Sequence, residues 1–151
     1  GRQILRHWSF RFQEFSQRYA DPTALPDLPT PEARAQHPTN RQMSTEIEDP
    51  VVKSKWEEIF VSVREFTKQK YREARELGIA REQARNLLIE HTPTRMYMAG
   101  TVRSWIHFCQ LRGGNGTQKE ATLIANEAAV ILHTHLPVVA AAADLYSGKK
   151  S

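Results

Sequence analysis

The chain has 151 residues, 40% of them hydrophobic, which is enough for one domain with a buried core. Its formal charge of +4, from 21 basic and 17 acidic residues, favours phosphate-bearing partners but does not by itself predict nucleic-acid binding. The single cysteine, Cys109, excludes an internal disulfide and any Cys-x-x-Cys pair, and no apolar run approaches the roughly 18 residues that span a bilayer. We therefore expect one cytoplasmic domain over residues 1–151 with no membrane partner.

The start of the chain predicts a strand followed by a loop. Phe10 and Phe12 alternate with polar residues, which is the period of a half-buried strand, and the alternation breaks at Glu14. Six prolines lie between residues 21 and 50 with few apolar residues, which predicts a long irregular loop over 21–50.

Helical patterns follow the loop. Apolar residues recur at helical spacing over 52–66, opposite a charged face, and predict a long amphipathic helix that ends at Gly78. A shorter helix is expected at about 80–90, with Arg81 and Arg85 one turn apart on one face and the apolar residues Ala84, Leu87 and Leu88 inward.

The last third predicts an extended segment and two more helices. Residues 94–100 have little helical patterning, and Thr101 is in place to cap a helix that stops at Gly113. The run Thr117–Glu120 has the form of a capping box. It is expected to open a helix that carries one row of apolar side chains on one side, namely Leu123, Ile124, Ala128, Ile131 and Leu132.

The run from Arg6 to Tyr19 is the strongest functional candidate, because it interleaves three arginines with aromatic residues. Arginine forks bind phosphate, and aromatic rings stack on bases or on a flavin, so one interpretation is a nucleotide or cofactor site. The other is an amphipathic strand whose arginines are merely solvated. Composition alone leaves the two about equally favoured.

The order of residues in this run resembles the signature of the flavin-dependent thymidylate synthases. That signature is Arg-His-Arg, seven residues and then Ser, and here it appears as Arg6–Trp8 followed by Ser16, with the family's Arg-Tyr pair at Arg18–Tyr19. Trp8 departs from the signature, since the family has its second arginine there.

Two further segments resemble the same family. Residues 78–85 are similar to its Gly-Ile-Pro-Arg-Glu-Glu-Ala-Arg block, and residues 101–112 are similar to its Asn-x-Arg-Ser…Leu-Arg helix, with Thr101 in place of the asparagine. Gln118 and Glu120 match its Gln-x-Glu. The resemblance begins partway into the family pattern, so we expect a chain truncated at its N-terminus relative to the family. It implies an α+β fold, mostly helical with a small, mainly antiparallel sheet.

The resemblance also implies a site, carried over position by position. The positions implied to bind deoxyuridine monophosphate (dUMP) are Gln3, Arg6, Glu14, Ser16, Gln17, Arg18, Arg85 and Arg112. The positions implied to bind flavin adenine dinucleotide (FAD) are Arg6, His7, Trp8, Glu14, Thr101, Val102, Arg103 and His107. Arg112 is the implied catalytic residue, because a fixed guanidinium beside the pyrimidine favours its ionisation.

The implied reaction is the reductive methylation of dUMP to dTMP. Methylenetetrahydrofolate supplies the carbon, reduced FAD the hydride and NADPH the reducing equivalents. The family's sites imply a homotetramer with shared flavins, small-molecule partners and no nucleic acid. No metal site is expected, since His133 and His135 are two apart on a helix and Cys109 lies mid-helix outside every motif. The alternatives are a non-catalytic module that binds single-stranded nucleic acid and an inactive fragment of the synthase.

Overall fold

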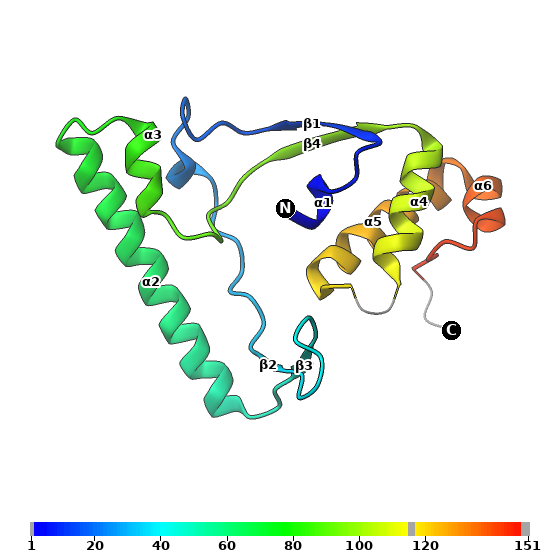
Figure 1. Cartoon of the computed structure of the whole chain (residues 1–151), viewed down its shortest axis with the longest axis horizontal. Helices are drawn as coiled ribbons and strands as arrows, with labels where there is room; N and C mark the ends of the chain where they lie inside the picture. The colour runs from blue at the N-terminus through cyan, green and yellow to red at the C-terminus, as the bar shows by residue number, and fades with distance from the viewer. Residues whose placement is uncertain (1, 115–116, 149–151) are drawn as a thin grey trace. The chain divides into compact units, whose positions relative to one another are not determined.

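Residues 2–114 and 117–148 are described by the computed structural model (Figure 1). About half of the chain is helical, and two two-stranded antiparallel sheets complete it, so the predicted mostly helical α+β class is confirmed. The chain divides into a terminal unit, Gly1–Gln13 with Tyr97–Ser151, and a central unit, Glu14–Met96. The single domain expected from chain length stays a prediction.

The terminal unit holds a short sheet and most of the later helices. Strands β1 and β4 pair with one another, and α4 packs on α5, which in turn packs on α6. The bounds are α1 Arg2–Leu5, β1 Phe10–Glu14, β4 Met96–Gly100, α4 Val102–Gly113, α5 Lys119–His135 and α6 Pro137–Ala142. The predicted strand, its end at Glu14 and the extended segment before Thr101 are thereby confirmed.

The core of the terminal unit is built from aromatic rings and small side chains. Phe10 and Phe108 are buried together with the alanines of α5, and the Phe10 ring meets Trp105 edge to face at 4.8 Å between centroids. Gly100 lies directly beneath this ring, because a Cβ built on it would be 2.5 Å from Phe10 Cδ1. The close approach of β4 to Phe10 therefore requires glycine.

Helix α5 buries a different face from the one expected. The fully buried row is Ala121, Ala125 and Ala129, whereas Leu123 and Ile131 are exposed. Alanines four residues apart form a smooth stripe, and this stripe lets α4 approach closely. The expected row was therefore wrong for Leu123, Ile124 and Ile131, which are exposed, whereas Ala128 and Leu132 are partly buried against the core. Hydrophobicity alone does not reveal which stripe is small enough for close contact.

The cap predicted for α4 is confirmed, whereas the cap predicted for α5 is wrong. Thr101 caps α4, its hydroxyl accepting a hydrogen bond from the Ser104 N–H at 3.2 Å, as predicted. The capping box at the start of α5 was wrong: the N-cap is Gln118, with no side-chain cap bond, and the Thr117 hydroxyl donates to the Leu111 carbonyl at 3.4 Å instead. The Thr117 side chain is thus bonded to the C-terminal end of α4 and does not cap α5.

The central unit contains the long predicted helix. Its elements are the 3-10 turn η1 Pro22–Ala24, β2 Arg34–Gln36, β3 Ser44–Glu46, α2 Pro50–Glu76, α3 Arg81–Ala84 and the 3-10 turn η2 Arg85–Leu87. The irregular loop expected over 21–50 is therefore wrong in part, because β2 and β3 form an antiparallel pair that places Ala35 opposite Thr45. The turn between them is organised by the His37 ring, whose Nδ1 accepts from the Asn40 N–H at 3.1 Å.

Helix α2 is delimited by local signals at both ends. The Asp49 carboxylate accepts from the Val51 N–H at 2.8 Å, and Pro50 occupies the first turn, where its missing N–H costs no hydrogen bond. At the other end Gly78 has a φ of +82°, and the Ile79 N–H reaches back to the Ala74 carbonyl at 3.0 Å. This is a Schellman motif, so the predicted end at Gly78 is confirmed.

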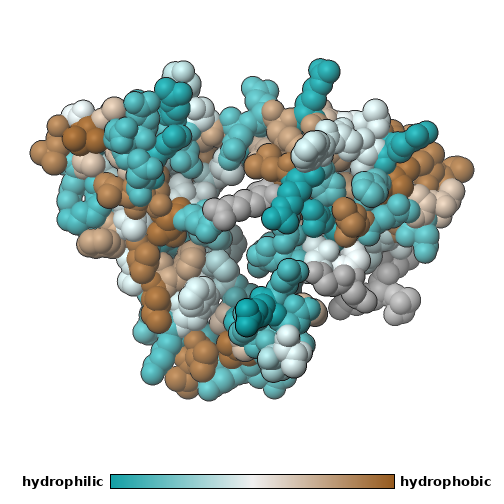
Figure 2. Space-filling model, in the orientation of Figure 1, coloured by the Kyte–Doolittle hydropathy of each residue, from teal (hydrophilic) through white to brown (hydrophobic). Residues whose placement is uncertain are grey.

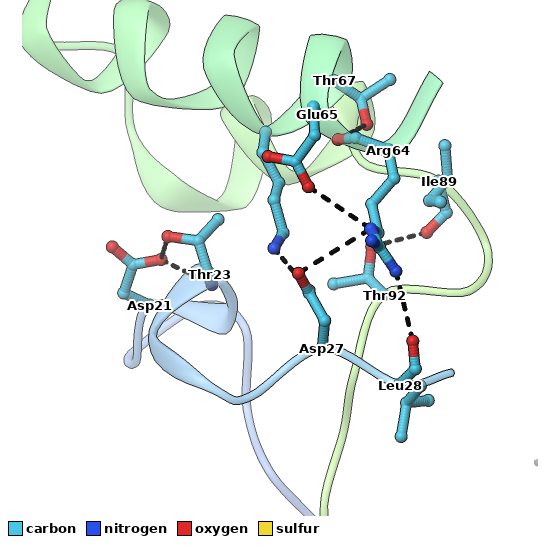
Figure 3. Close-up of polar contacts among 10 residues, drawn as sticks. Asp21, Thr23, Asp27, Leu28, Arg64, Glu65, Thr67, Ile89 and Thr92 are labelled. Carbon is cyan, nitrogen blue, oxygen red and sulfur yellow. Dashed lines mark hydrogen bonds and ion pairs between the residues drawn. The ribbon is translucent and has the colours of Figure 1, made fainter. Parts of the chain in front are cut away.

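An ion-pair network ties the proline-rich segment to α2 (Figure 3). Asp27 accepts from Lys68 and lies 3.7 Å from Arg64 Nε, while Arg64 also donates to the Leu28 carbonyl at 3.2 Å. Further along, the Trp56 indole N–H donates to the Pro31 carbonyl at 2.7 Å. Side chains of α2 thus hold a segment that lacks regular structure of its own.

The apolar face of α2 is largely uncovered in the single chain. Figure 2 shows hydrophobic residues along its length, and Ile59 and Phe66 are 58% and 59% exposed. Val52 and Val63, on the same stripe, are also exposed, whereas Tyr71 near the C-terminal end is buried. An apolar stripe of this length is ordinarily covered, so this face is suited to a second polypeptide surface.

Candidate functional site

Three residues predicted for the site meet in the terminal unit. The Nε–H of Arg112 donates to His7 Nε2 at 2.9 Å, and one of its terminal nitrogens donates to the Gln3 backbone carbonyl at 3.1 Å. Arg112 is in the last turn of α4, while Gln3 and His7 belong to α1 and the turn after it. A guanidinium has five N–H groups, so most of its donors are left for a ligand.

Gln3 contributes a second feature to this group. Its side-chain nitrogen donates to Gln118 Oε1 at 3.2 Å, but its own Oε1 is buried and has no partner among the described residues. A buried acceptor without a donor is costly, which marks it as a position where a bound ligand supplies an N–H or O–H. Arg112, which is bonded to the Gln3 backbone carbonyl, thus has free donors, and the Gln3 side chain has an acceptor without a partner among the described residues.

His7 is enclosed by aromatic rings. It is only 6% exposed, and its ring meets Phe108 edge to face at 4.9 Å and Phe10 at 6.2 Å between centroids. Burial, and then the positive charges of Arg112 and His107, hold its pKa below the ordinary value of 6.5. Because Nε2 accepts the Arg112 N–H, the neutral ring carries its proton on Nδ1.

The predicted flavin positions of α4 are on its first two turns. Val102, Arg103 and His107 are exposed there, while Thr101 is engaged in the cap described above. Trp8 is 95% exposed, although it directly follows the buried His7. Exposed aromatic and cationic side chains at a helix N-terminus are suited to a planar, phosphate-bearing ligand.

The remaining predicted residues lie in the central unit, apart from Arg6, which is exposed in the terminal unit. Glu14 accepts from the Thr94 hydroxyl at 3.0 Å, and Arg18 pairs with Glu82 at 3.1 Å. Arg85 begins η2, and Gln17 is half-buried. Ser16 makes backbone contacts only, so no base is hydrogen-bonded to its hydroxyl among the described residues.

Two partners in this group were missed by the sequence analysis. Glu82 is 64 residues from Arg18, and Thr94 is 80 residues from Glu14. No spacing rule links residues so distant, although Glu82 does belong to the block at residues 78–85. Both contacts occupy proposed substrate positions, so a ligand has to displace them or share them.

The described part of the chain offers little support for a metal site or for a reactive thiol. Residues 2–114 and 117–148 hold no group of three side chains arranged to bind a metal ion. Burial raises the pKa of the Cys109 thiol to about 11, and the His133 ring is bonded to the Leu145 carbonyl at 2.9 Å. Among the described helices, none has the length and apolar character to cross a membrane.

Comparison with known proteins identifies the family. The sequence profile described as thymidylate synthase complementing protein matches residues 1–138. A flavin-dependent thymidylate synthase of Synechocystis is 46% identical over 93% of this chain and 64% of that protein. A probable flavin-dependent thymidylate synthase of Paramecium bursaria Chlorella virus 1 is 42% identical over 94% of this chain and 65% of that protein. The chain thus spans just under two thirds of the length of these relatives.

The fold is also that of a solved structure. A UMP/dUMP methylase from Streptomyces cacaoi, bound with 5-Br UMP, superposes with a TM-score of 0.81. The superposition covers 93% of this chain and 67% of that chain at 24% identity, so it shows a common fold. Together with the profile match and the two relatives, it leads to one conclusion: the chain belongs to the thymidylate synthase complementing protein family.

Proposed function

We propose that the chain carries the nucleotide and flavin site of a flavin-dependent thymidylate synthase, which methylates dUMP to dTMP with methylenetetrahydrofolate as carbon donor. The names of the two relatives support this activity. The observation that carries the proposal is the group of Arg112, His7 and Gln3, because it combines free guanidinium donors with a side-chain acceptor that has no partner among the described residues. The imide edge of uracil presents the complementary pair, a carbonyl acceptor beside an N–H donor.

The nucleotide positions are proposed as carried over from the family. Arg112 and Gln3 are assigned to the pyrimidine ring, and the other positions, taken to act on the sugar and phosphate, are Arg6, Glu14, Ser16, Gln17, Arg18 and Arg85. Ser16 is assigned to binding, since its hydroxyl has no adjacent base. Arg112 acts as the catalytic residue by stabilising negative charge on the ring, which a guanidinium held by two hydrogen bonds does without reorganising.

FAD is proposed as the cofactor, with NADPH as its reductant. When bound, the flavin supplies the hydride for the one-carbon unit. The exposed indole of Trp8 and the exposed first turns of α4 fit a planar ring and a diphosphate, so the proposed contacts are Arg6, Trp8, Glu14, Thr101, Val102, Arg103 and His107. His7, which is buried, is left out of this set.

A homotetramer with shared sites is proposed on the basis of the uncovered face of α2. Ile59→Glu with Phe66→Glu places two charges on that face and is expected to yield monomers by light scattering, with loss of bound flavin. Glu57→Lys, on the opposite face, is the control and keeps the assembly. Monomers that retain full flavin occupancy would contradict shared sites.

The single cysteine fits a reducing compartment, and the cytoplasm is proposed as the location of the protein.

The decisive experiment uses the purified chain with added FAD. We expect flavin absorbance bands, saturable binding of dUMP, and dTMP formation with NADPH and methylenetetrahydrofolate. Arg112→Ala is expected to weaken dUMP binding at least about tenfold, since a hydrogen bond to a charged group is lost. Arg41→Ala removes an exposed arginine outside the site and is the matched control.

Each alternative predicts a different result. A chain that binds FAD and dUMP but forms no dTMP is an inactive fragment of the synthase. A chain that takes up no flavin but binds single-stranded oligonucleotides with a steep salt dependence is a nucleic-acid-binding module. That second result would refute the proposed function.

A further inference from the structure

We propose that His7 is a positioning residue for Arg112, which it holds against the nucleotide, and that it does not contact the flavin; this inference rests on the proposed function. The core holds His7, and His7 in turn holds Arg112. The His7 backbone is held on both sides, its N–H donating to the Ile4 carbonyl at 3.1 Å and its carbonyl accepting from the Phe10 N–H at 3.2 Å.

The His7 ring is fixed as firmly as its backbone. Phe108 is fully buried and meets the ring edge to face, and Phe10 meets it as well, so the neighbouring rings restrict rotation of the imidazole. Its Nε2 therefore presents one lone pair in a constant direction, and the Arg112 Nε–H occupies it at 2.9 Å. An imidazole that is 6% exposed and already bonded through Nε2 has little surface left for a flavin.

The second bond of Arg112 completes the arrangement. One terminal nitrogen of the guanidinium donates to the Gln3 carbonyl, so two bonds from different N–H groups fix both the position and the plane of the guanidinium. Without His7, one bond remains and the guanidinium rotates about it. A long side chain that rotates freely loses entropy on binding, which weakens its contribution to affinity.

Protonation of His7 opposes this arrangement. A protonated ring has no lone pair on Nε2, and the charged groups that face His7, Arg112 and His107 on α4, then repel it. Because these groups and burial hold the His7 pKa below 6.5, the neutral, accepting form dominates at neutral pH. Nucleotide affinity is therefore full at neutral pH and falls in acid, as the pH drops through the lowered pKa of His7.

The test compares two variants of the full chain, with dUMP as the probe and FAD present. His7→Phe keeps the ring shape and removes the acceptor, and is expected to bind dUMP roughly tenfold to a hundredfold more weakly. His7→Gln keeps an acceptor near the Nε2 position and is expected to recover most of this affinity. Flavin absorbance per chain stays unchanged in both variants. His133→Phe, which removes the bond between another histidine ring and the Leu145 carbonyl, is the matched control.

A double-mutant cycle separates positioning from direct contact. In an Arg112→Ala background, His7→Phe is expected to cause no further loss of dUMP affinity, because the residue it positions is gone. The pH profile supplies an independent measurement: affinity declines in acid for the native chain and declines less for His7→Gln. This comparison removes the contribution of the dUMP phosphate, which itself titrates near pH 6.

The outcomes distinguish failure of the positioning role of His7 from failure of the proposed function. Loss of flavin from His7→Phe with unchanged dUMP affinity, or additive losses in the cycle, overturns the positioning role while the proposed function stands. A native chain that binds no dUMP overturns the proposed function and this inference with it. If His7→Phe does not fold, as judged by circular dichroism, equal acid profiles for the native chain and His7→Gln overturn the inference.

Discussion

Replacing Gly100 by alanine tests how closely β4 approaches the aromatic core. The added Cβ would lie 2.5 Å from Phe10 Cδ1 and 2.7 Å from Cε1, both far inside van der Waals contact. The Phe10 ring cannot turn away freely, because it is buried against Trp105 and Phe108. The strand or the ring has to shift by several tenths of an ångström, and either movement disturbs the core.

The expected cost is that of overpacking a well-packed site, about 1–3 kcal/mol in the free energy of unfolding. For a chain of this size, each 1 kcal/mol corresponds to roughly 2–4 °C, so the melting temperature is expected to fall by about 2–12 °C. The measurement is thermal and urea unfolding followed by circular dichroism. Gly113→Ala is the control, since its Cβ would lie 3.5 Å from Asn126 Oδ1, an ordinary contact.

A second variant identifies the clash itself. Phe10→Val removes Cδ1 and Cε1, the two ring atoms that the Cβ would approach most closely, so Gly100→Ala is expected to cost less in that background than in the native chain. A Gly100→Ala variant no less stable than Gly113→Ala would refute the reasoning. So would a cost that is the same with valine at position 10, because the clash would then lie elsewhere.

Three other perturbations have defined outcomes. Cys109, with its pKa raised to about 11, is expected to resist alkylation at pH 8 until urea unfolds the chain; rapid labelling of the native chain would contradict its burial. Asp49→Ala removes the cap of α2 and is expected to cost about 0.5–2 kcal/mol by urea unfolding, whereas Asp49→Ser retains most of the stability. The hydrogen bond from Lys68 lowers the pKa of Asp27 below 3.8, so its contribution is present above that pH and is lost in acid. Asp27→Asn is expected to cost about 0.5–1 kcal/mol at pH 7 and to flatten the acid limb of the stability profile.

The family was predictable because the candidate site positions follow a linear signature. The spacing from Arg6 to Ser16 and the two later blocks pointed to the family that the comparisons then identified. The signature assigns positions to a ligand, but it cannot say which side chains reach that ligand. His7 and Trp8 are neighbours in the signature, yet one is buried and the other exposed.

Local chemistry in the sequence determined where several elements begin and end. Asp49 before Pro50, and Gly78 with its positive φ, delimit α2 through hydrogen bonds within a few residues of each end. Thr101 starts α4 in the same way, and the alternation after Phe10 is the local pattern of a strand. These signals act over one turn or one strand, so they can be recognised without knowing what packs nearby.

Only the tertiary structure decided which surfaces meet. Whether α5 buries its alanines or its larger residues depends on how closely α4 approaches, and the three-residue strands within 34–46 are stabilised by pairing with each other rather than by their own pattern. The contact between His7 and Arg112 joins residues 105 positions apart. Such contacts depend on distances across the fold, and a sequence read in order contains the residues that make them but no measure of those distances.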